Sequence, residues 1–393
     1  MRLTHRDGRL IHLGYCTNVH PAEDIPGILA QLDAYAVPVR AQLGCDLLGL
    51  GLWLSADVAA MLAGDPARTA RLRRELTSRG LEVVTLNGFP YRAFQAPVVK
   101  HAVYRPDWTT PERLAYTLNL ARVLAELLPE EADRGSVSTL PIGWRDGWDA
   151  DQSAAAHRNL DALAGGLAQL ATHTGRTVRV AIEPEPGCLV ESTQDAVREL
   201  STVDTEWLGV CLDLAHLACA WEEPAEALAR LERAALPVVK VQISAALSVE
   251  HPGRAREALR QYVEPRFLHQ TRGPDGRGTD DLGEALQAGL PGPWRVHYHV
   301  PLHAQPVPPL RATVPVAVAA LEALLGGPVA RCDHFEVETY TWDVLPEGHR
   351  PGTPQQLAAG IAGELAFARD QLTTVLGGRL PKRAAGREPA VRP

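Results

Sequence analysis

Residues 178–186 read VRVAIEPEP, a short β-branched run that ends in two carboxylates. The run is too short for a typical helix, and its composition is that of a buried strand. Because side chains alternate across a strand, its Val and Ile residues share one face. Glu183 and Glu185 lie on the other face. The stretch therefore predicts a strand that packs under helices on one side and carries acidic groups inward on the other.

Similar strand-like runs alternate with helical stretches along the chain. The helical stretches are amphipathic and rich in Ala, Leu and Arg, as at 56–79, 112–128, 153–174 and 223–235. Regular alternation of strand and helix predicts a parallel sheet with right-handed crossovers. The nine strand-like runs are LIHLGYCTNV, DLLGLGLWLS, LEVVTLNGF, GSVSTLPIGW, VRVAIEPEP, WLGVCLDLAH, PVVKVQIS, WRVHYHVPLH and DHFEVETYTW.

This alternation predicts the α/β class and, within it, a closed (β/α)₈ TIM barrel. Such barrels take about 250 residues and tolerate insertions to beyond 400, so the 393 residues fit one elaborated barrel domain over residues 8–376. A doubly wound sheet is disfavoured, since YCTNVHPAED (15–24) lacks a glycine-rich phosphate turn. One strand is surplus: either VKVQIS (239–244) or VHYHVPLH (296–303) is the seventh strand, and the other belongs to an insertion near it.

Composition narrows the function classes. The chain is 46% hydrophobic and 22% charged, which is typical of a globular protein, and its tail at 377–393 reads as disordered. A net charge of −8 argues against nucleic-acid binding. No signal peptide or membrane-length apolar run is present, so we expect a cytoplasmic protein without membrane insertion that binds a small-molecule metabolite. The six cysteines form no CxxC pair and are expected to be reduced.

The alternation rule places polar groups inward near the C-terminal ends of several strands. Catalytic residues of TIM barrels come from these ends. The same rule sends Val239, Val241 and Ile243 outward. The polar residues expected to face inward are Thr85, Asn87, Asp213, Gln242, Ser244, His297, His299, Glu336 and Glu338.

Buried carboxylates need a cation, an arginine or a proton, and Arg and Lys are scarce on these faces. Glu183, Asp213 and Glu338, with at least one imidazole from His297 or His299, therefore predict a site for a divalent metal: Mn²⁺, Mg²⁺, Co²⁺ or Zn²⁺. Each residue alone also has a structural explanation, as a helix cap or a hydrogen-bonded core residue. The combination across strands favours the metal site.

Further residues are candidates for the substrate wall. The long loop at 89–110 suggests a lid or a subunit contact, which leaves a homo-oligomer open. Lys100 and Arg105 in this loop either meet an anionic substrate or are solvated. Trp144 either stacks on a sugar ring or packs in the core. The candidate substrate-binding residues are Glu185, Asn87, His20, Trp144 and Gln242.

Several motifs carry a resemblance to a known family. The E-P at 183–184, the D-x-x-H at 213–216 and the E-x-E-T-Y at 336–340 resemble the xylose isomerase-like barrels of the sugar phosphate isomerase/epimerase superfamily. Within that group the chain resembles the metabolite traffic protein EboE family over about residues 11–347. That finer resemblance rests on LGYCTNVHP, LNGFPY, VKHAVYRPDW, LPIGW, EPEPGC and EVETYTWDVLP.

The resemblance implies a metal held by Glu183, Asp213, a seventh-strand His and Glu338, with His216 contacting substrate. This sequence departs at the third ligand, where VKVQIS has Gln242. Either the metal is held more loosely, or His297 or His299 replaces the imidazole, or the site is degenerate.

Three functions follow. The first is a metal-dependent isomerase or epimerase of a polyhydroxy-carbonyl compound, in which Glu183 and Glu338 shuttle the proton. The second is a non-catalytic metabolite carrier that uses the same barrel mouth. The third is a metal-dependent phosphoesterase, which needs more histidines.

Overall fold

Eight parallel strands close into a barrel in the computed structural model, which describes residues 1–377; apart from Gly377, the tail expected at 377–393 lies outside the described residues. The sheet closes where the first barrel strand pairs in parallel with the second, with Gly14 opposite Gly49. A short strand, β1 (Arg2–Thr4), pairs antiparallel with the first. The barrel strands are β2 (Leu10–Cys16), β3 (Leu48–Trp53), β4 (Leu81–Asn87), β5 (Gly135–Thr139), β6 (Val178–Ile182), β7 (Leu208–Asp213), β8 (Val238–Ile243) and β14 (His334–Val337). The predicted (β/α)₈ barrel is confirmed.

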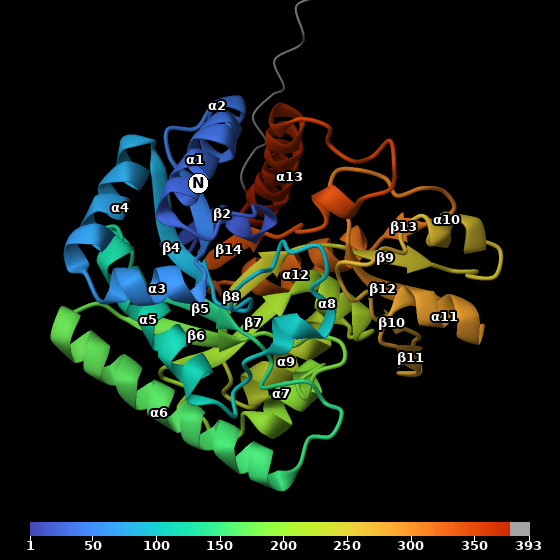
Figure 1. Cartoon of the computed structure of the whole chain (residues 1–393), viewed down its shortest axis with the longest axis horizontal. Helices are drawn as coiled ribbons and strands as arrows, with labels where there is room; N and C mark the ends of the chain where they lie inside the picture. Colours follow the sequence, from blue (N-terminus) through green and yellow to red (C-terminus); the bar gives the residue numbers. More distant parts are fainter. Residues whose placement is uncertain (378–393) are drawn as a thin grey trace, which may run out of the picture.

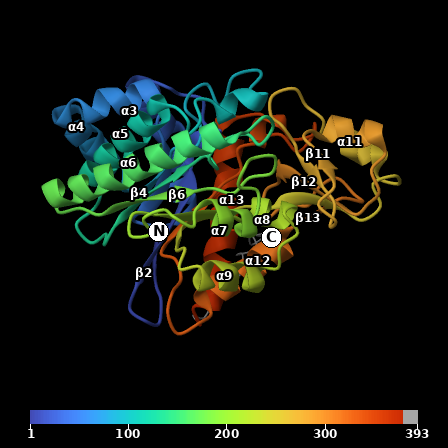
Figure 2. The same ribbon diagram turned by 90° about the horizontal axis from the view of Figure 1, so that it is seen from below.

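Helices cover the outside of the barrel, as Figures 1 and 2 show. Each crossover between neighbouring strands carries at least one helix, and apolar side chains of the helices pack on the outward faces of the strands. The predicted helix over 56–79 is divided in two at Pro66. The helices are α1 (Ile25–Gln31), the π-turn η2 (Leu32–Ala36), α2 (Val37–Leu43), α3 (Ala56–Ala63), α4 (Pro66–Ser78), α5 (Pro111–Leu127), α6 (Ala150–Thr174), α7 (Thr193–Glu199), α8 (Leu214–Cys219), α9 (Pro224–Arg233), α12 (Val314–Leu325) and α13 (Pro354–Val375).

The seventh strand is VKVQIS, because β8 lies between β7 and β14 in the barrel. VHYHVPLH begins within β12 (Trp294–His299), the central strand of a second, antiparallel sheet in the order β11-β10-β12-β9-β13. This insertion stands beside the barrel at the right of Figure 1. Its elements are β9 (Ala246–Val249), α10 (Arg256–Arg260), β10 (Thr271–Arg272), β11 (Gly278–Thr279), α11 (Leu282–Ala288), β12 and β13 (Arg311–Ala312).

On β8, Val239 was predicted to face outward, and this prediction is wrong. The pairing of β7 with β8 shifts by one residue between Val210 and Cys211, which is a β-bulge in β8. As a result Val239 packs against Ala181 and Cys211 on the inward side, whereas an unbroken alternation places it outside. Side chains alternate between the two faces of a strand only where its pairing with the neighbouring strand is regular.

The barrel interior holds a buried cation that the scarcity of inward Arg and Lys did not lead us to expect. Lys240 lies 2.6 Å from Glu336, and both side chains are fully buried. The ammonium also donates to Ser138 Oγ at 3.2 Å. Gly51 makes room for this pair, since a Cβ at residue 51 would lie 1.4 Å from Glu336 Oε2. Lys240 lies two residues before Gln242 and therefore on the same face of the strand, so its inward direction could have been predicted from the sequence.

Two further observations concern the cysteine side chains and the apolar character of the helices. All six cysteines are free thiols, as expected. Among residues 1–377, none of the helices has the length and apolar composition to cross a bilayer.

Breaking the interior ion pair should destabilise the barrel. Lys240→Met leaves the Glu336 carboxylate buried without a partner and should lower the free energy of unfolding by about 3–5 kcal/mol, measured by urea denaturation. The double variant Lys240→Met/Glu336→Leu should recover most of that loss. As a control, Arg260→Met removes the exposed pair with Glu257 and should change stability little. A Lys240→Met protein as stable as the wild type would contradict this role.

Candidate functional site

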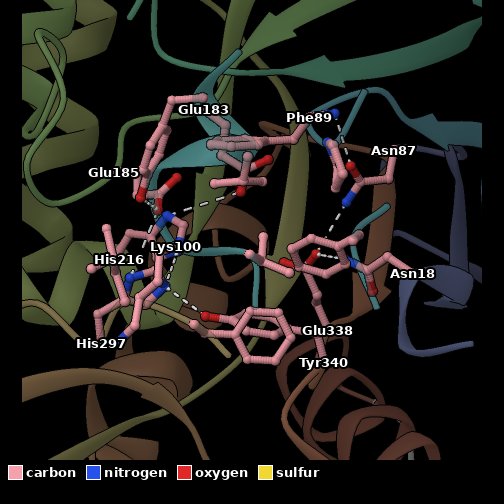
Figure 3. Close-up of a pocket in the computed structure, with 17 residues that line it drawn as sticks. Asn18, Asn87, Phe89, Lys100, Glu183, Glu185, His216, His297, Glu338 and Tyr340 are labelled. Carbon is pink, nitrogen blue, oxygen red and sulfur yellow. Dashed lines mark hydrogen bonds and ion pairs between the residues drawn. The ribbon is translucent and has the colours of Figure 1, made fainter. Parts of the chain in front are cut away.

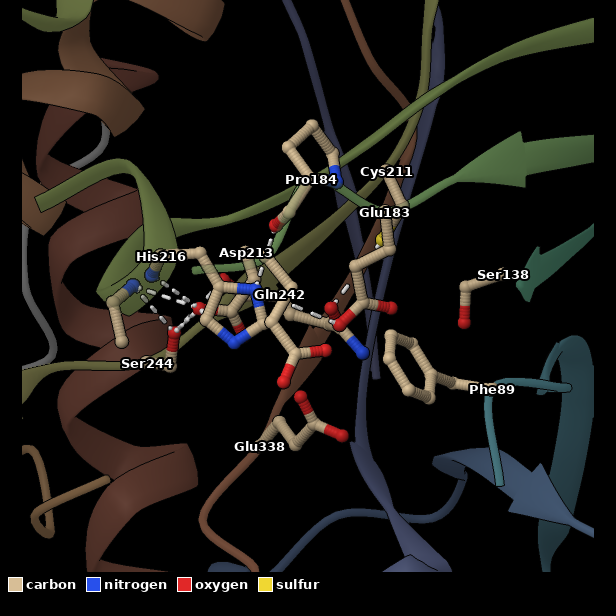
Figure 4. A network of polar contacts seen from close by, with 12 residues as sticks. Phe89, Ser138, Glu183, Pro184, Cys211, Asp213, His216, Gln242, Ser244 and Glu338 are labelled. Carbon is tan, nitrogen blue, oxygen red and sulfur yellow. Dashed lines mark hydrogen bonds and ion pairs between the residues drawn. The ribbon is translucent and has the colours of Figure 1, made fainter. Parts of the chain in front are cut away.

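Three carboxylates from three strand ends meet at the C-terminal mouth of the barrel. Glu183 follows β6, Asp213 ends β7 and Glu338 follows β14, and each is at most 4% exposed. Figure 4 shows them turned toward one region beside His216. Among the described residues, imidazoles are the ion-pair partners of Glu183 and Asp213 within 4.0 Å, and none of the three carboxylates has an Arg or Lys at that distance. The predicted convergence is present, without an arginine to neutralise it.

Asp213 is the anchored member of the three. Its Oδ1 accepts from the backbone N–H of Ala215 and His216 at the start of α8 and from Ser244 Oγ at 2.8 Å. Burial opposes ionisation of Asp213, but the neighbouring His216 and His299 and these donors outweigh it and lower the pKa of the carboxyl. Its second oxygen, Oδ2, is buried and has no partner. Asp213 is thus held ionised with one oxygen free.

The surroundings of Glu183 and Glu338 shift the pKa in the direction opposite to that of Asp213. Burial raises the pKa of both carboxyls well above the usual range, and the nearby acidic groups add to the shift. Glu338 Oε1 accepts from Asn18 Nδ2 at 2.7 Å and from Asn87 Nδ2 at 3.0 Å. Glu183 Oε2 is buried without a partner. Without a cation these two groups favour the protonated form.

Three imidazoles lie against the carboxylates, and their hydrogen bonds fix the same tautomer in each. His216 Nδ1 lies 2.8 Å from the carbonyl of Pro184, and His299 Nδ1 lies 2.9 Å from the carbonyl of Glu338. A carbonyl only accepts, so each Nδ1 carries the hydrogen. His297 Nδ1 lies 2.7 Å from Gln270 Oε1. The Gln270 amide is itself oriented by its Nε2, which donates to a backbone carbonyl at 3.0 Å.

The three Nε2 atoms are therefore left as lone pairs in the neutral rings. Burial lowers the pKa of His299 to about 4 and that of His297 well below its usual value. His299 Nε2 has no partner, while His216 Nε2 and His297 Nε2 face each other at 2.8 Å. Two lone pairs at that separation repel each other, so one of the two nitrogens must carry a proton and donate it to the other, or a cation must lie between them. Histidines that bind metals show the same arrangement, with the far ring nitrogen bonded to a carbonyl or carboxylate.

The candidate ligand atoms form overlapping sets. Each set has its ligand atoms within 4.8 Å of one another. Asp213 belongs to two sets, and so do His216 and His299. The sets are Glu183 with Asp213 and His216, Asp213 with His299 and Glu338, and the three histidines 216, 297 and 299.

A pocket opens above these groups, with Glu185 on its wall. Figure 3 shows Glu183, Glu185, His216 and His297 on one side and Asn18, Asn87 and Glu338 on the other. Burial raises the pKa of Glu185 to about 7, and its Oε1 accepts from Tyr104 Oη at 2.6 Å. Asn87 and Glu185, two of the candidate substrate-binding residues, thus both line this pocket.

Other candidates lie outside this pocket. His20 bonds Tyr15 Oη at 3.2 Å and stacks on Tyr35. Trp144 packs behind Tyr104, with ring centroids 4.8 Å apart. Both positions follow from local packing that a single sequence does not reveal.

Gln242, also predicted to bind substrate, does not line the pocket, and the two charged candidates of the 89–110 loop are already paired. Gln242 lies beneath the floor, where its Oε1 accepts from Cys211 Sγ at 3.4 Å. Lys100 lines the pocket but is paired with Asp281. Arg105 is paired with Asp107 and is 64% exposed.

Sequence reasoning missed several residues of the site. Gln270 belongs to the insertion, and Tyr104 to the 89–110 loop, so no strand alternation pointed to them. Asn18 follows the first barrel strand and could have been found, because the same strand-end rule applies to TNV at 17–19. Tyr340 also lines the pocket, directly after the E-x-E-T motif.

Comparison with known proteins places this architecture. The profile of the xylose isomerase-like TIM barrel family matches residues 39–288. No curated protein sequence matches the chain significantly.

Several crystal structures share the fold. The IolI protein with a bound zinc atom is 12% identical, with a TM-score of 0.51 over 93% of this chain and 99% of that chain. A xylose isomerase-like TIM barrel protein from Mycobacterium smegmatis in complex with magnesium is 14% identical, with a TM-score of 0.52 over 93% and 98%. D-psicose 3-epimerase with D-tagatose from Clostridium cellulolyticum H10 is 14% identical, with a TM-score of 0.50 over 92% and 99%. At these identities the likeness shows the fold alone.

The opposite fields at Glu183 and Asp213 predict opposite effects on the metal-free protein. Burial raises the pKa of the Glu183 carboxyl in the folded protein, so its contribution to stability is lost as pH rises above the pKa of an unfolded glutamate; the melting temperature of Glu183→Gln should therefore gain on that of the wild type as pH rises. Asp213→Ala removes the acceptor that begins α8 and should lower stability by about 1–2 kcal/mol. Calorimetry in EDTA measures both. A difference in melting temperature between Glu183→Gln and the wild type that does not change with pH would contradict the raised pKa of Glu183.

Proposed function

The chain belongs to the xylose isomerase-like TIM barrel family, and we propose that it is a metal-dependent isomerase or epimerase of a polyhydroxy-carbonyl metabolite. The observation that carries the proposal is the set of buried, unpartnered ligand atoms at the barrel mouth: Glu183 Oε2, Asp213 Oδ2 and His299 Nε2. Unsatisfied buried polar groups are destabilising unless something completes them. A divalent cation is the partner that suits all three.

The residues present fit such an ion. We propose that Glu183, Asp213 and Glu338 hold it together with His299, which takes the place of the imidazole that Gln242 on the seventh strand does not provide. His299 Nε2 lies 3.9 Å from Asp213 Oδ1 and has its Nδ1 hydrogen engaged. Mixed carboxylate and imidazole ligation suits Mn²⁺, Co²⁺ or Zn²⁺, as well as Mg²⁺. Fold relatives have been crystallised with zinc and with magnesium.

When bound, the metal would act as a Lewis acid that polarises a carbonyl and its neighbouring hydroxyl. Glu183 and Glu338 stand on opposite sides of the pocket, where one can take a proton from carbon while the other returns one. Asn18 and Asn87 hold Glu338 in place, and His216, oriented by the Pro184 carbonyl, would contact the substrate hydroxyls.

A carrier function is the second candidate, and Gln242 favours it. A neutral amide on the seventh strand is a weak ligand, and a protein that holds a metabolite for transfer needs only the pocket. This role fits the EboE-like motifs of the sequence, which a metabolite traffic protein would share. Solvent isotope exchange separates the carrier from the enzyme.

Metal content tests the proposed centre. The purified protein should contain about one equivalent of divalent metal per chain, and Glu183→Gln and Asp213→Asn should each lose most of it, as should His299→Asn. Elemental analysis after gel filtration is the measurement. Glu364→Gln and His303→Asn serve as matched controls, because Glu364 is a buried carboxyl bonded to Thr339 and His303 follows β12 outside the ligand sets. Unchanged metal in all three site variants would remove the centre.

Proton transfer tests the activity. The metal-loaded protein in D₂O should introduce deuterium next to the carbonyl of at least one ketose or aldose in a panel, and Glu338→Gln should reduce the rate by at least about 100-fold, the contribution typical of a general base. Mass spectrometry follows the exchange. Binding of a panel member without exchange would favour the carrier.

A further inference from the structure

The residues that line the pocket fall into a polar half and an apolar half. Its floor is formed by the carboxylates, imidazoles and amides described above. The rest of the lining is apolar apart from Lys100, Tyr104 and Tyr340 and belongs to the same cavity, which has about 490 Å³ of space free of protein atoms, part of it open to solvent. The apolar lining side chains are Phe89, Phe94, Val99, Val103, Phe267 and Leu268.

The apolar half is built by two segments that lock together. Phe94, from the 89–110 loop, lies 5.3 Å from the ring of Phe267, which the insertion supplies, and 5.3 Å from that of Tyr340. Phe267 and Tyr340 are 4.9 Å apart and edge to face. The backbone N–H groups of Val99 and Lys100 both donate to the carbonyl of Arg266, at 2.7 and 2.9 Å. These bonds pre-form the aromatic wall.

The pocket is poor in cationic groups. Among the described residues that line it, Lys100 is the one Lys or Arg, and Asp281 neutralises it. Arg266, just behind the wall, donates to Gln95. A phosphate is recognised by Arg or Lys and by several N–H donors, whereas here its neighbours would be aromatic rings and acidic side chains. Burying that charge without partners is strongly unfavourable.

We infer that the ligand is an uncharged hydroxy-carbonyl compound that carries an aromatic or alkyl group, and not a sugar phosphate. The inference rests on the proposed function for the position of the hydroxy-carbonyl end at the carboxylates. The apolar group then occupies the wall of Phe94, Phe267 and Tyr340, where ring contacts and the loss of hydrated apolar surface both favour binding.

Three ketones test the inference by calorimetric titration of the metal-loaded wild-type protein. The probes are dihydroxyacetone, dihydroxyacetone phosphate and 1-hydroxy-4-phenylbutan-2-one. The phenyl ketone should bind at least about tenfold more tightly than dihydroxyacetone, since most of a ring is buried, and the phosphate ester should bind no more tightly than dihydroxyacetone. Preference for the phosphate ester, or a phenyl ketone that binds no better than dihydroxyacetone or not at all, would overturn the inference.

Variants locate the preference. Phe267→Ala should reduce the advantage of the phenyl ketone over dihydroxyacetone by at least about fivefold, as removal of a ring contact predicts. Val263→Ala, an exposed position of the same insertion, should leave it unchanged. If Phe267→Ala leaves the affinity advantage of the phenyl ketone over dihydroxyacetone unchanged, the aromatic wall does not bind the phenyl group. Because the titrations compare affinities and the D₂O experiment follows exchange, failure of the enzyme proposal shows separately, as missing deuterium incorporation.

Discussion

Desolvation of acidic groups at the barrel mouth is the constraint on which this structure depends. Glu183, Asp213 and Glu338 are withdrawn from water by the barrel below, the 89–110 loop above and the insertion beside them. Ion pairs with arginine would satisfy them at the expense of the cavity. The protein instead leaves ligand atoms facing a common space, so the site is strained when empty and suited to a cation. The proposed chemistry and the raised pKa values of Glu183 and Glu338 share this single cause.

The insertion after β8 completes the site from outside the barrel. Its central strand delivers His297 and His299 to groups that the barrel strands hold, and Gln270 orients the first of these imidazoles. A seventh strand with Gln242 therefore does not by itself imply a lost metal centre, because the nitrogen ligand can come from another sheet. The same insertion supplies Phe267 to the upper wall. Metal environment and ligand preference are thus linked through one added segment.

Below the site the barrel interior is more polar than the branched aliphatic layers usual in TIM barrels. Lys240 and Glu336 neutralise each other beneath the carboxylates, and Gly51 provides the space. The ammonium also moderates the pKa values of Glu183 and Glu338, although burial dominates both. A buried pair at this depth supports the acidic floor electrostatically without occupying it.

Features that depend on local periodicity could be predicted from the amino-acid sequence. The alternation of strand and helix predicted the barrel, and the alternation of side chains along VRVAIEPEP, LGVCLDLAH and HFEVETY predicted which carboxylates turn inward, because a strand's two faces follow from its own backbone. The position of Asn87 and His216 at or just after strand ends also predicted that they lie at the barrel mouth.

Other features of the barrel and the site depend on contacts between segments that are far apart in the sequence. Whether VKVQIS or VHYHVPLH closes the barrel depends on which chain segment completes the hydrogen-bonded ring, and Val239 turns inward only because pairing with β7 creates a bulge. His20 and Trp144 lie outside the pocket because they pack on aromatic side chains of other segments, Tyr35 and Tyr104 respectively. The ring nitrogens of His216, His297 and His299 acquire their orientation from carbonyls on other elements, a contact between segments that no local pattern encodes.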